Sequence, residues 1–146
     1  LRSSSAASDV YKRQPLYHEY WISSVTLPMR TNQIKSFLSN NGIRGFGDGL
    51  RTVSNPMEFV LGLENPNDIN LIVEEFCNWL LPVSDEISSS DKEELVEIIV
   101  GGNPNIWEDE LNEYLDDPTD EKKEDLNKKL RLLLKELCLM PEYYLS

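Results

Sequence analysis

Carboxylates are the residues of this chain whose number and spacing come closest to a chemically useful site. Residues 108–125 hold ten of them, and Asp116, Asp117 and Asp120 surround Pro118 at an expected turn. Calcium takes six to eight oxygen ligands, so carboxylates clustered at a turn can bind it. An EF-hand loop, however, needs a glycine at its sharp turn, and this stretch has none. We interpret it as a solvated acidic face, with a calcium site as the alternative.

An aromatic segment, residues 16–22 (LYHEYWI), holds the only histidine and is the second candidate. One histidine makes no histidine-rich metal site, and the chain has neither a G-x-S-x-G nor an H-E-x-x-H motif. The glycines of residues 43–53 match no phosphate-binding spacing, so we expect a plain connecting loop there. We expect no catalytic residue and no cofactor in this chain, and the absence of a catalytic motif favours a chain that is not an enzyme. The binding candidates in and after the aromatic segment are Tyr17, His18, Trp21 and Arg30.

Tryptophan and cysteine could also form sites. Trp21, Trp79 and Trp107 could make a carbohydrate platform, but the last two lie in expected amphipathic helices, which favours core packing. Cys77 and Cys138 lie among apolar residues, which favours buried thiols, with a disulfide between them as the alternative.

The composition limits the partners. The 146 residues include 26 acidic and 14 basic ones, a formal net charge of −12. Such a surface repels phosphate backbones and anionic lipid, so we expect no nucleic-acid partner. No apolar run approaches the roughly 18–20 residues that cross a bilayer, so we expect no membrane span in this chain.

The first fourteen residues, LRSSSAASDVYKRQ, show no hydrophobic periodicity. They resemble the translation of a sequencing-adapter fragment found at the ends of environmental assemblies. We therefore interpret residues 1–14 as a non-native or disordered tail, and residues 15–146 as the C-terminal helical region of a larger protein.

The apolar spacing of the remainder predicts an all-α fold, an irregular bundle of about six short-to-medium helices with no significant β-sheet. Expected helix starts are Ser24 or Thr26, Asn55, Asn67 or Asp68, Ser90, Asn103 and Thr119. Expected helix ends are near Ser39, Leu63, Leu81, Gly101, Asp116 and Leu139.

The last helix organises the others. Its apolar stripe is Leu126, Leu130, Leu133 and Leu137, widened by Leu134 and Cys138. We expect Lys128, Lys129, Arg131, Lys135 and Glu136 to lie largely on the opposite side. The expected apolar face of the helix over residues 69–81 includes Ile69, Ile72, Val73, Phe76, Trp79 and Leu80.

Two short motifs resemble a known family. Trp21, Ile22, Ser24, Thr26, Leu27, Pro28 and Arg30 fit W-I-x-S-x-T-L-P-x-R, and residues 137–146 end in M-P-E-Y-Y-L-S. Both are similar to segments of the domain of unknown function family 1800 from Bacteroidetes-like sequences, and N-P-M-E-F-V resembles a later helix of that family. The resemblance implies the C-terminal region of an exported protein in the periplasm, on the outer surface or secreted. It implies two partners, the upstream part of the same polypeptide and a co-encoded exported sulfatase-like protein. The family has no established catalytic residues to transfer.

Three functions remain open. The first is a non-catalytic helical segment of an exported, cell-envelope-associated protein. The second is a glycan- or calcium-binding module that uses the aromatic segment or the acidic turn. The third is an accessory part of an enzyme whose active site lies upstream.

Overall fold

The computed structural model describes residues 26–45, 49–81, 84 and 87–140. The chain divides into two units, residues 1–33 and 34–146. The described part of the first unit is the beginning of helix α2 (Thr26–Phe37), and the other elements belong to the second unit. Tyr17, His18, Trp21 and the predicted tail lie outside the described residues.

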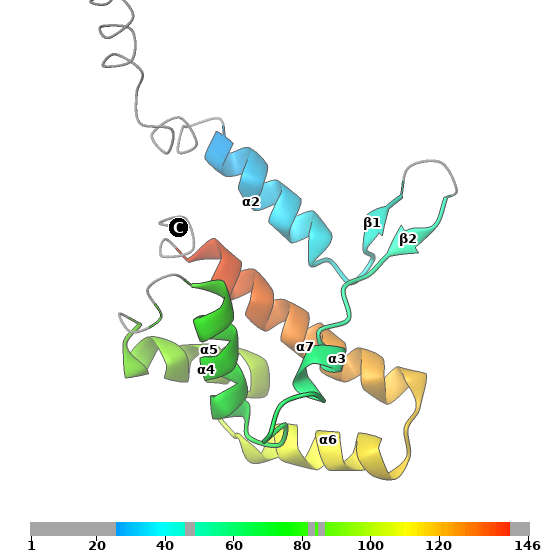
Figure 1. Cartoon of the computed structure of the whole chain (residues 1–146), viewed down its shortest axis with the longest axis vertical. Coiled ribbons are helices and arrows are strands. Elements are labelled where there is room, and N and C mark those ends of the chain that lie inside the picture. Colours follow the sequence, from blue (N-terminus) through cyan, green and yellow to red (C-terminus); the bar gives the residue numbers. More distant parts are fainter. Residues whose placement is uncertain (1–25, 46–48, 82–83, 85–86, 141–146) are drawn as a thin grey trace, which may run out of the picture. The chain divides into compact units, whose positions relative to one another are not determined.

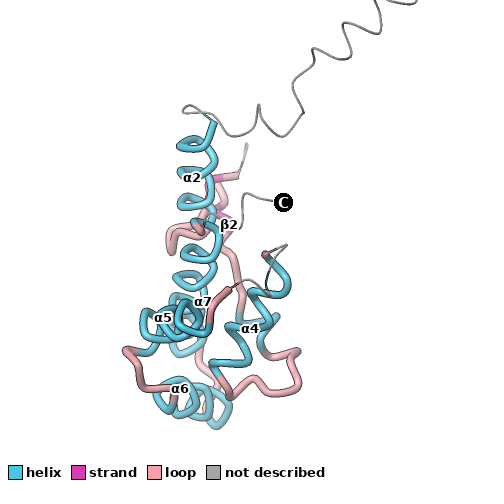
Figure 2. The backbone as a smooth tube through the Cα atoms, turned by 90° about the vertical axis from the view of Figure 1, so that its left-hand side faces the viewer, coloured by secondary structure: helices cyan, strands magenta, loops and turns pink. Residues whose placement is uncertain are grey.

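The second unit contains a short hairpin, β1 (Ile43–Arg44) and β2 (Arg51–Thr52), and five helices. These are α3 (Met57–Val60), α4 (Ile69–Leu80), α5 (Ser89–Val100), α6 (Asn105–Asp116) and α7 (Asp120–Leu139). With α2 they make six helices among the described residues, which confirms the all-α class. Helix α7 contacts α3, α4, α5 and α6 (Figure 1). Figure 2 shows α4, α5 and α6 gathered around α7.

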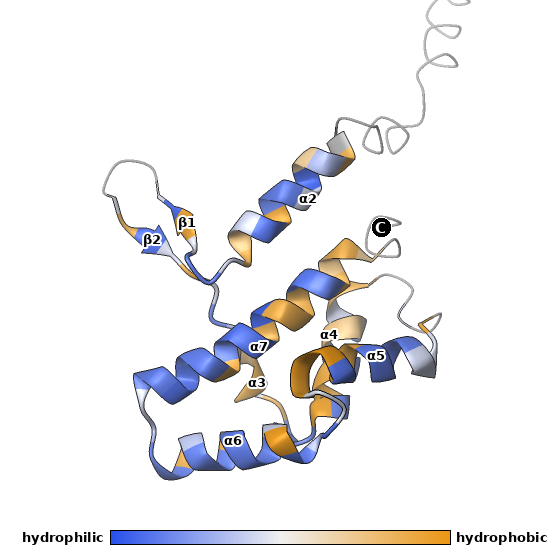
Figure 3. Ribbon diagram, turned by 180° about the vertical axis from the view of Figure 1, so that it is seen from behind, coloured by the Kyte–Doolittle hydropathy of each residue, from blue (hydrophilic) through white to orange (hydrophobic). Residues whose placement is uncertain are grey.

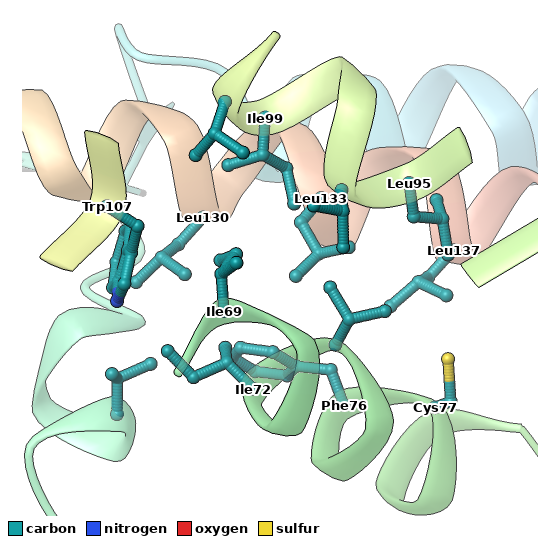
Figure 4. Packing of buried hydrophobic residues seen from close by; sticks show 14 of the residues in the cluster. Ile69, Ile72, Phe76, Cys77, Leu95, Ile99, Trp107, Leu130, Leu133 and Leu137 are labelled. Carbon is teal, nitrogen blue, oxygen red and sulfur yellow. The ribbon is translucent and has the colours of Figure 1, made fainter. Parts of the chain in front are cut away.

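The core lies where these helices meet. Leu126, Leu130, Leu133 and Leu137 are at most 1% exposed, so the predicted leucine stripe is confirmed. Figure 3 shows hydrophobic ribbon gathered where α4, α5 and α7 meet, whereas α6 is mostly hydrophilic. In the close view of Figure 4, Ile69, Ile72 and Phe76 of α4 face Leu130, Leu133 and Leu137 of α7. Burial of this apolar surface is the main favourable contribution to the fold.

Local signals set several helix ends as predicted. The Thr119 hydroxyl accepts a hydrogen bond from the Lys122 N–H, and the Asp68 carboxylate accepts one from the Asn70 N–H. Gly101 ends α5 in the left-handed conformation, with φ 63°. Helix α7 ends at Leu139, before the residue that precedes Pro141.

Three local predictions were wrong. The glycine-punctuated loop contains an antiparallel pair, with Ile43 opposite Thr52. Gly42, with φ +64°, permits it, since a Cβ there would lie 2.4 Å from the Thr52 carbonyl oxygen. Helix α5 is capped by Ser88 in a capping box with Asp91, two residues before the predicted Ser90, and the neighbouring Ile87 is buried.

The third error concerns α3. Asn55 does not cap it: the residue before its first turn is Pro56, which makes no side-chain cap, and the Asn55 amide donates to the Glu58 side chain at 3.3 Å. Asn127 of α7 caps it instead: its Oδ1 accepts the Met57 N–H at 2.9 Å. Both residues are buried, at 0% exposure for Met57 and 4% for Asn127. A tertiary contact therefore satisfies an N–H that the first turn of a helix leaves without a partner.

Candidate functional site

The acidic turn between α6 and α7 is held by a lysine of the same chain. Asp116, Asp117 and Asp120 are all exposed there. The Lys122 ammonium group donates to the carbonyl oxygens of Glu113 and Asp117, both at 3.3 Å, and to Asp117 Oδ2 at 3.0 Å. It thereby also satisfies carbonyl groups at the C-terminus of α6, where positive charge is favourable.

This geometry does not favour the calcium alternative. Within the described residues, no group of three or more histidine, cysteine, aspartate or glutamate side chains is arranged to hold a metal ion. The Lys122 ammonium group pairs with the Asp117 carboxylate, where a bound calcium ion would have to lie. The other described candidate, Arg30, is half-buried in the first unit and is engaged with other groups of the chain.

An aromatic surface, which the sequence did not predict, lies at the α3–α4 contact. Trp79 is 72% exposed, so its predicted place in the core was wrong, whereas Trp107 is fully buried as predicted. The Trp79 ring meets Phe59 edge to face, with 5.7 Å between centroids, and Phe59 also packs against the buried Phe76 at 5.1 Å. The aromatic contacts therefore extend from the buried Phe76 through Phe59 to the exposed Trp79. We name these three residues the Trp79 surface.

Arg131 lies on the predicted side of α7, away from the leucine stripe, but it is buried there, at 1% exposure, which the sequence did not predict. Its Nε donates to Asn40 Oδ1 at 3.2 Å, its Nη1 to the Ser54 carbonyl oxygen at 3.0 Å, and its Nη2 to Glu124. These partners lie before and after the hairpin and on α7. Arg131 therefore ties both ends of the hairpin segment to the long helix, and its charge is compensated by one carboxylate.

The groups with shifted pKa values show no catalytic arrangement. The hydrogen bond and charge of Lys123 lower the pKa of Glu58, and the hydrogen bond to Glu58 raises the pKa of Lys123. This pair joins α3 to α7 at the surface. Burial raises the pKa of the Cys77 thiol, which keeps it protonated and unreactive. Cys77 and Cys138 are both buried, as the apolar spacing predicted, and they form no disulfide with each other.

No family model, curated protein or solved structure matches this chain. None of the helices in the described ranges combines the length and the apolar character required to span a bilayer.

Proposed function

We propose that this chain is a non-catalytic helical module of an exported, cell-envelope-associated protein. In this proposal the Trp79 surface binds the upstream part of the same polypeptide. The observation that carries it is the 72% exposure of a tryptophan that continues the core through Phe59 and Phe76. The export, the upstream partner and a co-encoded sulfatase-like protein are adopted from the family resemblance of the two motifs.

The exposed tryptophan can contribute much of the binding energy of a small interface. A tryptophan buries up to about 250 Å², and Trp79 is 72% exposed, so at about 25 cal/mol per Å² covering its exposed part is worth up to about 4.5 kcal/mol. Single residues of this magnitude are the hot spots of protein interfaces, and tryptophan is enriched among them.

The charge around Trp79 defines the partner further. Glu75 lies four residues before Trp79 and so shares its side of α4. The whole chain has 12 more acidic than basic residues. Two copies of such a surface repel each other, so a heterologous partner is favoured over self-association. We propose that the partner carries an apolar pocket with lysine or arginine at its rim.

The described residues also support a non-catalytic role. Burial raises the pKa of the Cys77 thiol, Lys122 pairs with Asp117 in the acidic turn, and the Glu58–Lys123 pair is an exposed ion pair between two helices. Enzyme sites instead bring a nucleophile, a base and an orienting group within hydrogen-bond reach of one another.

The test begins with long-read sequencing of the DNA upstream of this reading frame. The encoded upstream part is then produced, and its binding to the full chain is measured by calorimetry. We expect Trp79→Ala to weaken binding by about 30-fold or more, the effect of losing a hot spot of at least about 2 kcal/mol. Leu115→Ala, which changes an exposed residue of α6, is the matched control and should keep wild-type affinity.

Two results would contradict the proposal. The first is equal affinity of the Trp79→Ala and Leu115→Ala variants for the upstream part. The second is a start codon immediately before Leu1, which would leave no upstream part to bind. Titration of tryptophan fluorescence with a glycan panel, in the wild type and in Trp21→Phe and Trp79→Phe, addresses the alternative module, because stacking of a sugar on one ring would change the emission that the corresponding variant loses.

A further inference from the structure

A hollow lined mainly by basic and polar side chains lies on the side of α7 opposite to the core stripe. It measures about 240 Å³ and is lined by Lys35, Leu38, Ser39, Asn40, Lys128, Arg131, Leu132 and Lys135. All of these residues belong to the second unit. Four are cationic and none is acidic, in a chain whose acidic residues outnumber the basic ones by 26 to 14.

Helical spacing concentrates this charge. Lys128, Arg131 and Lys135 follow one another at steps of three and four on α7, so they share one side of the helix. Lys35 lies in the last turn of α2, a helix that contains no acidic residue. The sequence reveals the spacing on α7 but not the approach of Lys35 and Asn40, about 90 residues earlier in the chain.

The charge of the hollow is only partly compensated. Arg131 pairs with Glu124, and Lys128 pairs with Asp125 at 2.7 Å. Lys35 and Lys135 form no ion pair within the part of the chain that the structure describes. Four cations against two carboxylates leave two positive charges at the hollow.

The floor of the hollow is fixed rather than adaptable. The buried Arg131 guanidinium group holds Asn40 through its Oδ1. This bond assigns the Asn40 oxygen to Arg131 and leaves the amide N–H groups as donors for another acceptor. An amide oriented by a buried arginine, and two ammonium groups without an ion pair among the described residues, are donors of the kind that bind oxyanions.

We infer that this hollow binds a divalent tetrahedral oxyanion, sulfate or phosphate. The two uncompensated charges match a divalent anion, and the volume suits a single small group, since it is below the roughly 300 Å³ at which typical ligand pockets begin. Lys35 and Lys135 supply the charge, and Asn40 supplies a directional hydrogen bond. The inference goes beyond the proposed function, because the hollow and the Trp79 surface share no residue.

The test is an NMR titration of the full ¹⁵N-labelled chain with sodium sulfate and, separately, with sodium phosphate. Sodium chloride at matched ionic strength is the reference, because it screens charge without supplying a tetrahedral anion. We expect saturable shifts of the amide signals of residues 35–40 and 128–135 with one or both oxyanions. The anion that saturates at the lower concentration is the preferred ligand.

Matched variants assign the site. Lys35→Met and Lys135→Met remove the charge and keep an apolar stem, and each should weaken oxyanion binding about fivefold or more. Lys92→Met removes a cation that pairs with Glu74 outside the hollow and should change the affinity less than about twofold. The spectra themselves report whether each variant is folded.

Three results would overturn the inference: shifts identical to those with chloride, shifts spread over the whole surface, or equal weakening by all three variants. Trp79→Ala should leave oxyanion binding unchanged, so failure of this site and failure of the proposed function are distinguishable.

Discussion

Replacing Asn127 with alanine tests the inference that a side chain of α7 caps α3. In the folded chain the Met57 N–H donates to Asn127 Oδ1 at 2.9 Å, and neither residue is accessible enough for water to replace the bond. Asn127→Ala removes the acceptor and leaves a buried N–H without a partner, which costs about 1–3 kcal/mol. Alanine is a better helix former than asparagine and returns about 0.5 kcal/mol. We therefore expect a net loss of about 0.5–2.5 kcal/mol in the free energy of unfolding.

The assay is urea unfolding followed by circular dichroism. With a slope of about 2 kcal/mol per M, the loss lowers the midpoint by about 0.3–1.2 M urea. Asn112→Ala on the exposed side of α6 is the matched control, because it has the same helix-propensity gain and no buried partner. Hydrogen exchange of the Met57 amide should also become faster in Asn127→Ala. Equal midpoints for the two variants, with an unchanged Met57 exchange rate, would refute the reasoning.

Three further changes test other contacts. Trp107→Phe removes the hydrogen bond from its indole Nε1 to the Pro66 carbonyl oxygen, 2.9 Å long, and should cost about 1–3 kcal/mol; a loss below about 0.5 kcal/mol in urea unfolding would contradict this. Because Lys123 lowers the pKa of Glu58, the ion pair stabilises the fold above the pH at which an unfolded glutamate ionises, and this contribution disappears as the pH falls from about 5 to about 3. The stability difference between wild type and Glu58→Gln should therefore shrink over that range, and a difference independent of pH would refute it. The buried Cys77 thiol should react with iodoacetamide much more slowly in the native chain than in urea, and equal rates would show that it is accessible.

Trp79 shows where a pattern in the sequence misleads. Twelve residues of α4 contain more apolar side chains than one buried stripe can hold, so the expected face of six was too wide. Ile69, Ile72, Val73 and Phe76 are buried, whereas Trp79 lies at the edge of the stripe beside Phe59. The width of the predicted apolar face already indicated that part of it would be exposed, because an amphipathic helix buries only the part of its circumference that another element covers.

Local chemistry was enough to determine most of the helices and the leucine stripe. The caps at Asp68 and Thr119, the glycine end of α5 and the stop before Pro141 depend on residues within a few positions of each other, so a single sequence reveals them. The four leucines of α7 share a face because of the helical repeat alone.

Only the tertiary structure showed that Asn127 and Arg131 are buried and that the basic hollow forms. Asn127 bonds to Met57, which lies 70 residues earlier in the chain. Arg131 bonds to Ser54 and Asn40, which lie 77 and 91 residues earlier. The local sequence predicts that a polar side chain on a helix is exposed. Such a side chain can be buried only where a distant segment supplies a hydrogen-bond partner that compensates the loss of water. The sequence therefore determined where most of the helices begin and end and where the leucine face of α7 lies. The packing of distant segments determined which polar side chains are buried in contacts between elements, and which cations lie together at the basic hollow.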